Sequence, residues 1–140
     1  MGIIVYNRNF ENHQGDPNNY PIYRPSILGN PYTDKKLEKT KAIYQVSNRD
    51  EAIGQYGHYF DIMYNSNLKF KATVDEIYAK YKSGKDVYLE CYCKPLPCHG
   101  DVIKEKLEKR LLKEKIDNIR KNKNVISGQQ NAALEGNIQH

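Results

Sequence analysis

Apolar and polar residues alternate in three short segments of the chain, the pattern typical of β-strands. Residues 2–6 and 20–23 are short runs rich in β-branched and aromatic side chains, and residues 86–93 alternate strictly. In the last run Val87, Leu89, Cys91 and Cys93 share one face. We expect the first two runs to pair as an N-terminal hairpin, with Pro21 limiting the second run to an edge or to the start of a strand.

Between these strands apolar residues recur every three or four positions, as on the buried face of a helix. One such stripe covers residues 53–64, behind a capping residue at Asn48 or Asp50, and a second covers residues 70–81. A helical crossover between two strands implies parallel pairing. The pattern therefore predicts an α/β fold: a small Rossmann-like domain, with a short, mostly parallel sheet, an N-terminal hairpin and flanking helices.

A basic helix is expected to follow the third strand, with its first turn at residues 97–101. We expect one α/β domain over residues 1–120, which includes this helix, and a flexible polar tail over residues 121–140. The inner face of the helix is predicted to hold Ile103, Leu107, Leu111, Leu112, Ile116 and Ile119.

Two segments rich in proline and glycine, residues 24–32 and 93–101, each follow the carboxyl end of a predicted strand. In parallel α/β sheets the loops that leave these ends surround the ligand. We therefore expect the two segments to line one crevice. The amides of the helix start, with Gly100 allowing close approach, would stabilise an anion there. The residues predicted to bind the ligand are Arg24, Ser26, Gly29, Asn30, Tyr32, Cys93 and Gly100.

Simpler interpretations of these residues stay open, namely a surface salt bridge for Arg24 and a plain turn for Gly29–Pro31. Tyr32 and Tyr92 could stack against a flat ring or serve as ordinary packing residues. The chain contains neither a Walker phosphate-binding loop nor a dinucleotide-binding glycine motif. No cofactor is therefore assigned.

Catalytic chemistry would come from Cys98, His99 and Asp101, which stand together at the predicted helix start. A thiol in a first helical turn beside an imidazole can have a lowered pKa and act as a nucleophile, with His99 or Asp101 moving protons. A small buried thiol is the competing interpretation of Cys98.

Zinc is a further interpretation of this cysteine-rich region, with Cys91, Cys93, Cys98 and His99 as ligands. The spacing argues against it, because the usual Cys-x-x-Cys pair is missing and four ligands would lie within nine residues. The 3 cysteines are also a poor disulfide framework, which favours reduced thiols and a cytoplasmic location. No leader or membrane-spanning run is seen, which also favours a cytoplasmic protein.

The net charge of +5 for 140 residues comes from one segment, since residues 104–123 hold nine Lys or Arg and four Asp or Glu. Most of these side chains are expected on the solvated face of the basic helix. An electrostatic contact with nucleic acid is the alternative. It would use Lys106, Lys109, Arg110 and Lys113.

The two loop signatures together, Arg-Pro-Ser-Ile-Leu-Gly-Asn-Pro-Tyr at 24–32 and Cys-Tyr-Cys-Lys-Pro-Leu-Pro-Cys-His-Gly-Asp-Val-Ile at 91–103, resemble the family catalogued as domain of unknown function 4326. Members usually carry Trp where Tyr92 stands. The resemblance spans about residues 2–112. It implies a compact α/β domain from a phage or from bacteria, working inside a bacterial cell, and implies no settled activity.

These observations predict a small α/β protein that binds a nucleotide-like or phosphorylated small molecule between residues 24–32 and 93–101. Hydrolase or transferase activity on that molecule is one version of this hypothesis. A phage protein that sequesters a nucleotide without turnover is another. A nucleic-acid-binding accessory protein that uses the basic helix is the alternative from a different class.

Overall fold

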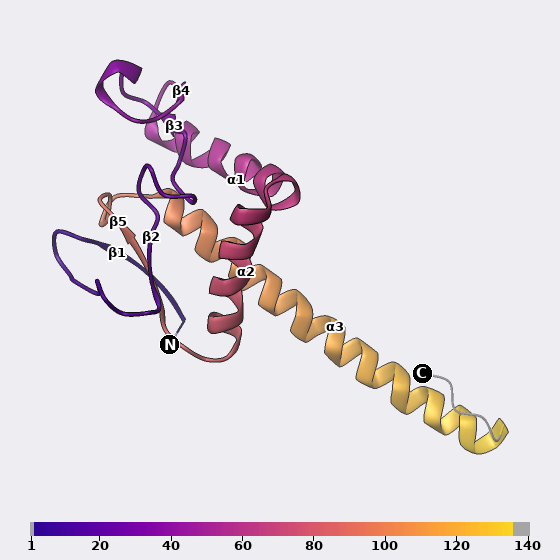
Figure 1. Cartoon of the computed structure of the whole chain (residues 1–140). Coiled ribbons are helices and arrows are strands. Elements are labelled where there is room, and N and C mark those ends of the chain that lie inside the picture. The colour runs from indigo at the N-terminus through magenta and orange to yellow at the C-terminus, as the bar shows by residue number, and fades with distance from the viewer. Residues whose placement is uncertain (1, 136–140) are drawn as a thin grey trace. The chain divides into compact units, whose positions relative to one another are not determined.

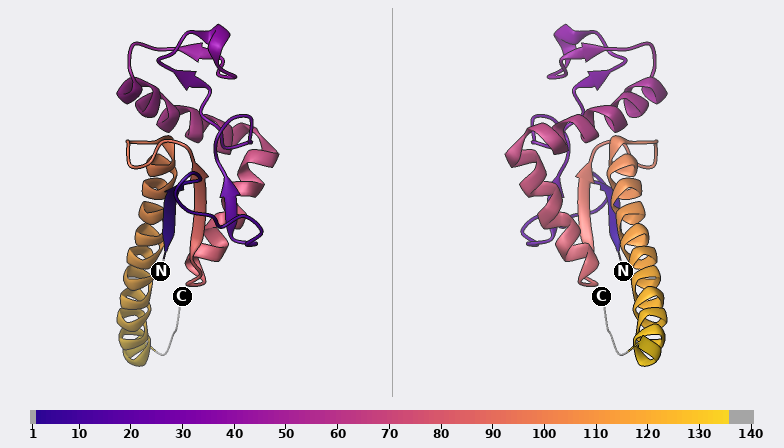
Figure 2. Two further views of the ribbon diagram at one scale, coloured as in Figure 1. Left: turned by 90° about the vertical axis from the view of Figure 1, so that its left-hand side faces the viewer. Right: turned by 90° about the vertical axis from the view of Figure 1, so that its right-hand side faces the viewer.

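Strand β5 (Val87–Cys91) forms the centre of a three-stranded sheet in the computed structural model. β1 (Ile3–Asn7) and β2 (Asn19–Pro21) flank it in the order β1-β5-β2, and both run parallel to it. Figure 2 shows β5 between its two neighbours. Leu89 is paired with Val5 on one side and with Tyr20 on the other. The carboxyl ends of all three strands therefore meet at one edge of the sheet.

The predicted N-terminal hairpin is wrong, because β1 and β2 each pair with β5 and not with each other. A hairpin requires antiparallel strands, whereas these two run in the same direction. The 8–18 connection is long enough to carry the chain back to the start of a parallel strand. The expectation for Pro21 is confirmed, since β2 lies at the edge of the sheet.

Helices α1 (Arg49–Ser66) and α2 (Leu68–Lys82) occupy the two segments in which the apolar period predicts helix. An asparagine side chain caps each helix, as Asn48 Oδ1 accepts from the Glu51 amide at 2.8 Å and Asn67 Oδ1 from the Phe70 amide at 2.9 Å. α2 ends just before Gly84, whose φ of 92° is one that glycine adopts without strain.

The apolar stripes of both helices form the core together with β5. Phe70, Val74 and Ile77 of α2 are buried, as are Tyr56 and Phe60 of α1. Two further strands, β3 (Tyr32–Thr33) and β4 (Tyr44–Gln45), form a small parallel pair around the 3₁₀ turn η1 (Leu37–Lys39). Figure 1 labels the helices and both groups of strands. The α/β class is confirmed, while the Rossmann-like comparison stays a prediction.

Helix α3 (His99–Glu135) begins at the predicted position and spans two compact units of the chain, Met1–Lys106 and Leu107–His140. The structure describes residues 2–135, apart from the side chains of Lys39 and of residues 123–135. The helical backbone continues past residue 120, where we expected a flexible tail to begin. The last part of that tail, residues 136–140, lies outside the described residues.

The expected inner face of the basic helix is only partly buried. Ile103 and Leu107 are buried, but Leu112, Ile116 and Ile119 are exposed. Helical spacing shows that these residues share one stripe, but it does not show what covers the stripe. Among the described residues, no helix combines the length and the apolar character that crossing a bilayer requires.

Candidate functional site

A pocket of about 270 Å³ lies in the unit Met1–Lys106, beyond the carboxyl ends of β2 and β5. Its walls come from the loop after β2, the first turns of α1, and the segment that joins β5 to α3. The predicted meeting of the two signature loops in one crevice is therefore confirmed. The predicted site residues that line the pocket are Arg24, Asn30, Tyr32, Cys93, Cys98 and His99.

The loop after β2 is held in shape mainly by its own polar groups. Arg24 donates from Nη1 to the carbonyl oxygens of Asn30 and Tyr32, at 2.7 and 3.4 Å. The Asn30 amide donates to the Ala52 carbonyl at 3.1 Å and accepts from the Tyr32 amide at 3.0 Å. Both ends of the Asn30 side chain are thus engaged within the protein. Asn30 joins the loop to α1 and is not a free ligand-binding group.

Gly29 and Ser26 support the loop from outside the pocket. A Cβ atom at Gly29 would lie 3.1 Å from the Ser26 carbonyl oxygen and 3.2 Å from Arg24 Cα, so the loop folds back too tightly for a side chain. The Ser26 hydroxyl oxygen is buried and has no hydrogen-bond partner among the described residues. Neither residue lines the pocket. Their predicted contact with a ligand is therefore not supported by their positions.

Positive charge on the pocket wall comes from Arg24, Arg49 and Lys35, against one carboxylate, Asp34. Burial lowers the pKa of Arg24, and the nearby Cys93 sulfur acts in the opposite direction. Arg49, in the first turn of α1, donates only a long bond, 3.4 Å, to the Pro97 carbonyl. The pocket therefore contains guanidinium groups with donors left to offer a ligand.

Asp101 and Cys98 build the start of α3 instead of providing free reactive groups. The Asp101 carboxylate accepts from the Cys98 amide at 3.1 Å, and the Gly100 amide donates to Cys98 Sγ at 3.3 Å. This is the reciprocal arrangement of a capping box, with sulfur in place of a hydroxyl. Lys94 also pairs with the carboxylate at 2.5 Å. Asp101 does not line the pocket.

Gly100 does not approach a ligand either, and the prediction for it is corrected. A Cβ at this position would meet Ile22 Cδ1 at 2.7 Å and Val5 Cγ1 at 2.8 Å. The glycine lets the first turn of α3 lie directly against the sheet. It faces these apolar side chains and is absent from the pocket lining.

His99 is buried and serves as a link between the helix start and the sheet. Its Nε2 atom lies 2.8 Å from the Ile22 carbonyl oxygen, so this nitrogen carries the proton, and its Nδ1 atom lies 3.8 Å from Cys98 Sγ. The ring also meets Tyr56 edge-on, with 4.7 Å between the centroids. Burial lowers the pKa of His99. The imidazole is therefore neutral near pH 7.

All three cysteines are free thiols that line the pocket. Hydrogen bonds with Cys91 and Cys93, together with burial, raise the pKa of Cys98. The expected lowering of the pKa at this thiol is therefore wrong. Cys91 and Cys98 lower the pKa of Cys93 instead, burial acts in the opposite direction, and Arg49 adds a smaller lowering. Spacing along the chain could not show which cysteine has the lowered pKa, because that depends on how the three thiols are arranged in space.

The residues proposed as zinc ligands do not form a metal centre in the part of the chain that the structure describes. No group of at least three His, Cys, Asp or Glu side chains there is arranged to hold a metal ion. The Nε2 atom of His99, one of the four proposed ligands, is used by the Ile22 carbonyl.

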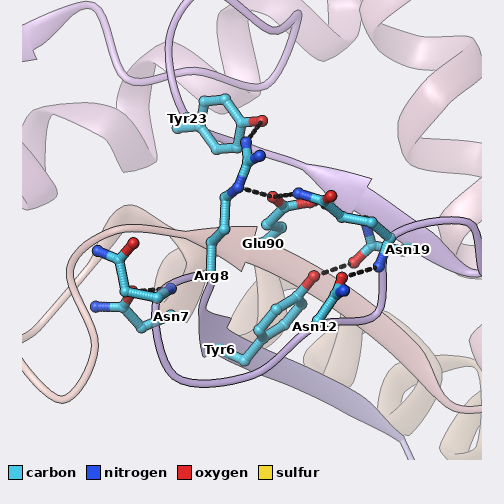
Figure 3. A network of polar contacts seen from close by, with 9 residues as sticks. Tyr6, Asn7, Arg8, Asn12, Asn19, Tyr23 and Glu90 are labelled. Atoms are coloured by element: carbon cyan, nitrogen blue, oxygen red, sulfur yellow. Dashed lines mark hydrogen bonds and ion pairs between the residues drawn. The ribbon is translucent and has the colours of Figure 1, made fainter.

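Beside the pocket lies a polar network that the sequence reasoning missed (Figure 3). Glu90, with 1% of its surface exposed, accepts from Asn19 at 2.9 Å and lies 3.5 Å from Arg8 Nε. Arg8 in turn donates to the Tyr23 hydroxyl at 3.0 Å. The Tyr23 ring packs against Tyr92, with centroids 4.9 Å apart, and both rings line the pocket.

Arg49 was also missed by the sequence reasoning, although it lines the pocket. The available signal was its place next to the predicted cap at Asn48, which puts it in the first turn of α1. That signal gives a position on the helix, but not the direction in which the side chain points.

Comparison with known protein families gives a match. The family model described as Domain of unknown function (DUF4326) matches residues 6–109 of the chain, a span that contains both signature loops. No curated protein and no solved structure matches the chain.

Proposed function

The chain belongs to the domain of unknown function 4326 family, whose two signature loops line the pocket. We propose that it binds a small phosphorylated or nucleotide-like molecule in this pocket, between residues 24–32 and 93–101. The observation that carries the proposal is the pocket itself, in which Arg24 and Arg49 face a shared cavity lined by aromatic rings. Arginine side chains bind phosphate through paired N–H donors. Tyr23 and Tyr92 also line the pocket, and aromatic rings can pack against a base or sugar.

The size of the pocket limits the ligand. Small-molecule sites commonly measure about 300–1,000 Å³, and this one measures about 270 Å³. A sugar phosphate, or the phosphate end of a mononucleotide, would be enclosed. A dinucleotide would extend into solvent.

The test is a thermal-shift titration with inorganic phosphate, ribose 5-phosphate and adenosine monophosphate. A ligand at about 100 times its Kd adds roughly 2.7 kcal/mol to the free energy of unfolding, which raises Tm by several degrees. Arg49→Gln should weaken binding about tenfold or more, because one charge-assisted hydrogen bond contributes about 1.5–3 kcal/mol. Lys69→Gln is the control, since Lys69 is exposed on α2 and is not part of the pocket lining.

The proposal fails if none of the three compounds raises Tm, or if Arg49→Gln binds as tightly as the parent chain. Mass spectrometry of the bound compound then separates two versions of the function. New products indicate a hydrolase or transferase. A compound recovered intact indicates sequestration, as expected of a protein that holds a host nucleotide for a phage.

Nucleic-acid binding through α3 is the second candidate function, supported by nine Lys or Arg residues over residues 104–123. Two of the side chains nominated for it have acidic neighbours: Lys106 lies 3.0 Å from an Asp61 carboxylate oxygen, and Arg110 lies 3.6 Å from Glu114. Nearby carboxylates reduce the attraction between a basic side chain and phosphate. The pocket therefore ranks first.

A further inference from the structure

The cysteines are arranged around one sulfur that is open to the pocket. Cys91 closes β5 and Cys98 precedes α3, and each has only 1% of its surface exposed. Cys93 lies between them in the chain and is partly exposed. All three cysteines line the same pocket. A ligand in the pocket would therefore meet Cys93 before the other two.

Positive and polar groups around Cys93 favour its ionised form. Arg49 lines the same pocket as Cys93 and brings a positive charge to its wall, and the neighbouring thiols and Arg49 lower the pKa of Cys93. Arg24 is close enough to interact with the same sulfur electrostatically. Cysteine reacts as the thiolate, and neighbouring cations are what produce a thiolate near neutral pH. The neighbouring thiols and burial raise the pKa of Cys98, so this sulfur keeps its proton.

We propose that Cys93 is a nucleophilic thiolate that forms a covalent bond to an electrophilic carbon of an anionic small molecule held by Arg24 and Arg49. The sulfur lone pair forms the S–C bond, and the bond between carbon and the leaving group breaks. The leaving group departs with the bonding pair of electrons. The thiolate form of Cys93 needs no base in this step. The anionic class of substrate rests on the proposed function, whereas the reactivity of the sulfur does not.

Alkylation of the full chain with iodoacetate and iodoacetamide tests the proposal without a known substrate. Each reagent forms an S–C bond and releases iodide, and peptide mapping shows which cysteine has reacted. At pH 6 a thiol with an ordinary pKa near 9.0 is ionised to about one part in a thousand. A thiol that is fully ionised at pH 6 gains nearly all of this thousandfold factor in its reaction rate. Part of the gain is lost, because a thiolate of low pKa is a weaker nucleophile. We expect Cys93 to react about ten times faster than N-acetylcysteine at pH 6.

Variants identify the groups responsible for this rate. Cys93→Ser should abolish the rapid labelling. Arg49→Gln should move the pH midpoint of labelling upward and reduce the preference for the anionic reagent. Lys69→Gln is the control, because it removes the same charge from a residue outside the pocket lining. It should change neither the pH midpoint of labelling nor the preference for iodoacetate. The labelling rate of Cys93 in the parent chain, measured against pH, tests the thiolate even if a cysteine variant fails to fold.

The two proposals fail through different results. Labelling of Cys93 no faster than that of N-acetylcysteine at pH 6, or faster labelling of Cys91 or Cys98, overturns the thiolate. Rapid labelling that shows no preference for iodoacetate, and that inorganic phosphate does not slow, overturns the anionic substrate and counts against the proposed function. Rapid, iodoacetate-selective labelling that phosphate slows supports both.

Discussion

At the scale of single residues, most polar groups that line the pocket are already used by the protein. Asn30 binds two backbone groups, and His99 binds the Ile22 carbonyl. Buried polar groups must be paired inside the protein, and this requirement competes with ligand binding for the same atoms. Arg49 keeps donors for the cavity because its bond to the Pro97 carbonyl is long, and Cys93 is partly exposed there. The predictions for function therefore rest on these two residues.

The buried imidazole of His99 predicts a pH dependence of stability. Burial lowers its pKa in the folded chain below the ordinary value of 6.5. The unfolded chain therefore binds more protons below that pH, and the free energy of unfolding falls as the pH drops from 6.5 toward the folded-state pKa. For one site the slope reaches at most about 1.4 kcal/mol per pH unit.

Urea denaturation of the parent chain and His99→Gln between pH 7.5 and 5 measures this slope. The variant should lose stability at pH 7.5 and show a shallower decline toward acid. His58→Gln, at an exposed position of α1, should keep the slope of the parent chain. Equal slopes for the parent and His99→Gln would show that His99 does not titrate on unfolding.

At the scale of elements, the junction between β5 and α3 organises the site. β5 ends with Cys91 at the pocket, and the cap formed by Cys98 and Asp101 starts the helix. Gly100 allows the first turn of α3 to lie against β1, and the positions of His99 and Cys98 follow from that contact.

Gly100→Ala tests this packing. The added methyl group would lie within 2.8 Å of side-chain carbons of Ile22 and Val5, so the first turn must move away from the sheet. Overpacking of this kind typically costs about 1–3 kcal/mol of unfolding free energy. Gly54→Ala is the matched control, because nothing lies within 4 Å of its new Cβ in α1. It should stabilise the chain by about 0.5–1 kcal/mol. Urea unfolding that shows no loss for Gly100→Ala would contradict the close packing.

At the scale of the whole molecule, parallel strand order places the loops after β2 and β5 at one edge, and the pocket lies there. All its lining residues belong to the unit Met1–Lys106, whereas much of the basic stretch belongs to Leu107–His140. The two candidate functions therefore use different parts of the chain, and they can be tested separately.

Replacing Lys109, Arg110 and Lys113 with glutamine separates them. We expect the affinity for ribose 5-phosphate to stay within about twofold of the parent value, because the lining of the pocket is unchanged. Any affinity of the parent for duplex DNA should fall steeply with salt, by about 0.9 in the logarithmic slope per phosphate contact, and the triple variant should lose most of it. Loss of ribose 5-phosphate binding in the variant would place that ligand on the helix instead.

Local patterns were enough to predict the helices and the position of the central strand. The cap of α1 at Asn48, the apolar stripes of α1 and α2, and the alternation around Leu89 are properties of neighbouring residues, and the structure reproduces them. The partners of the strands were harder to predict. β1 and β2 have the composition of a hairpin, yet both pair with β5. Strand pairing here joins residues 69 and 84 positions apart, which a local pattern does not reveal.

The sequence by itself determined the α/β class, the helix starts and the presence of both signature loops at one crevice, because period, capping and strand order act locally or through simple topology. Only the tertiary structure decided which groups in that crevice are free. It assigned Asp101 and Gly100 to the start of α3 and added Arg49 to the pocket, and it is the basis for our proposal of Cys93 in place of Cys98 as the reactive thiol. The physical reason is that hydrogen bonding, burial and charge at a side chain depend on its neighbours in space.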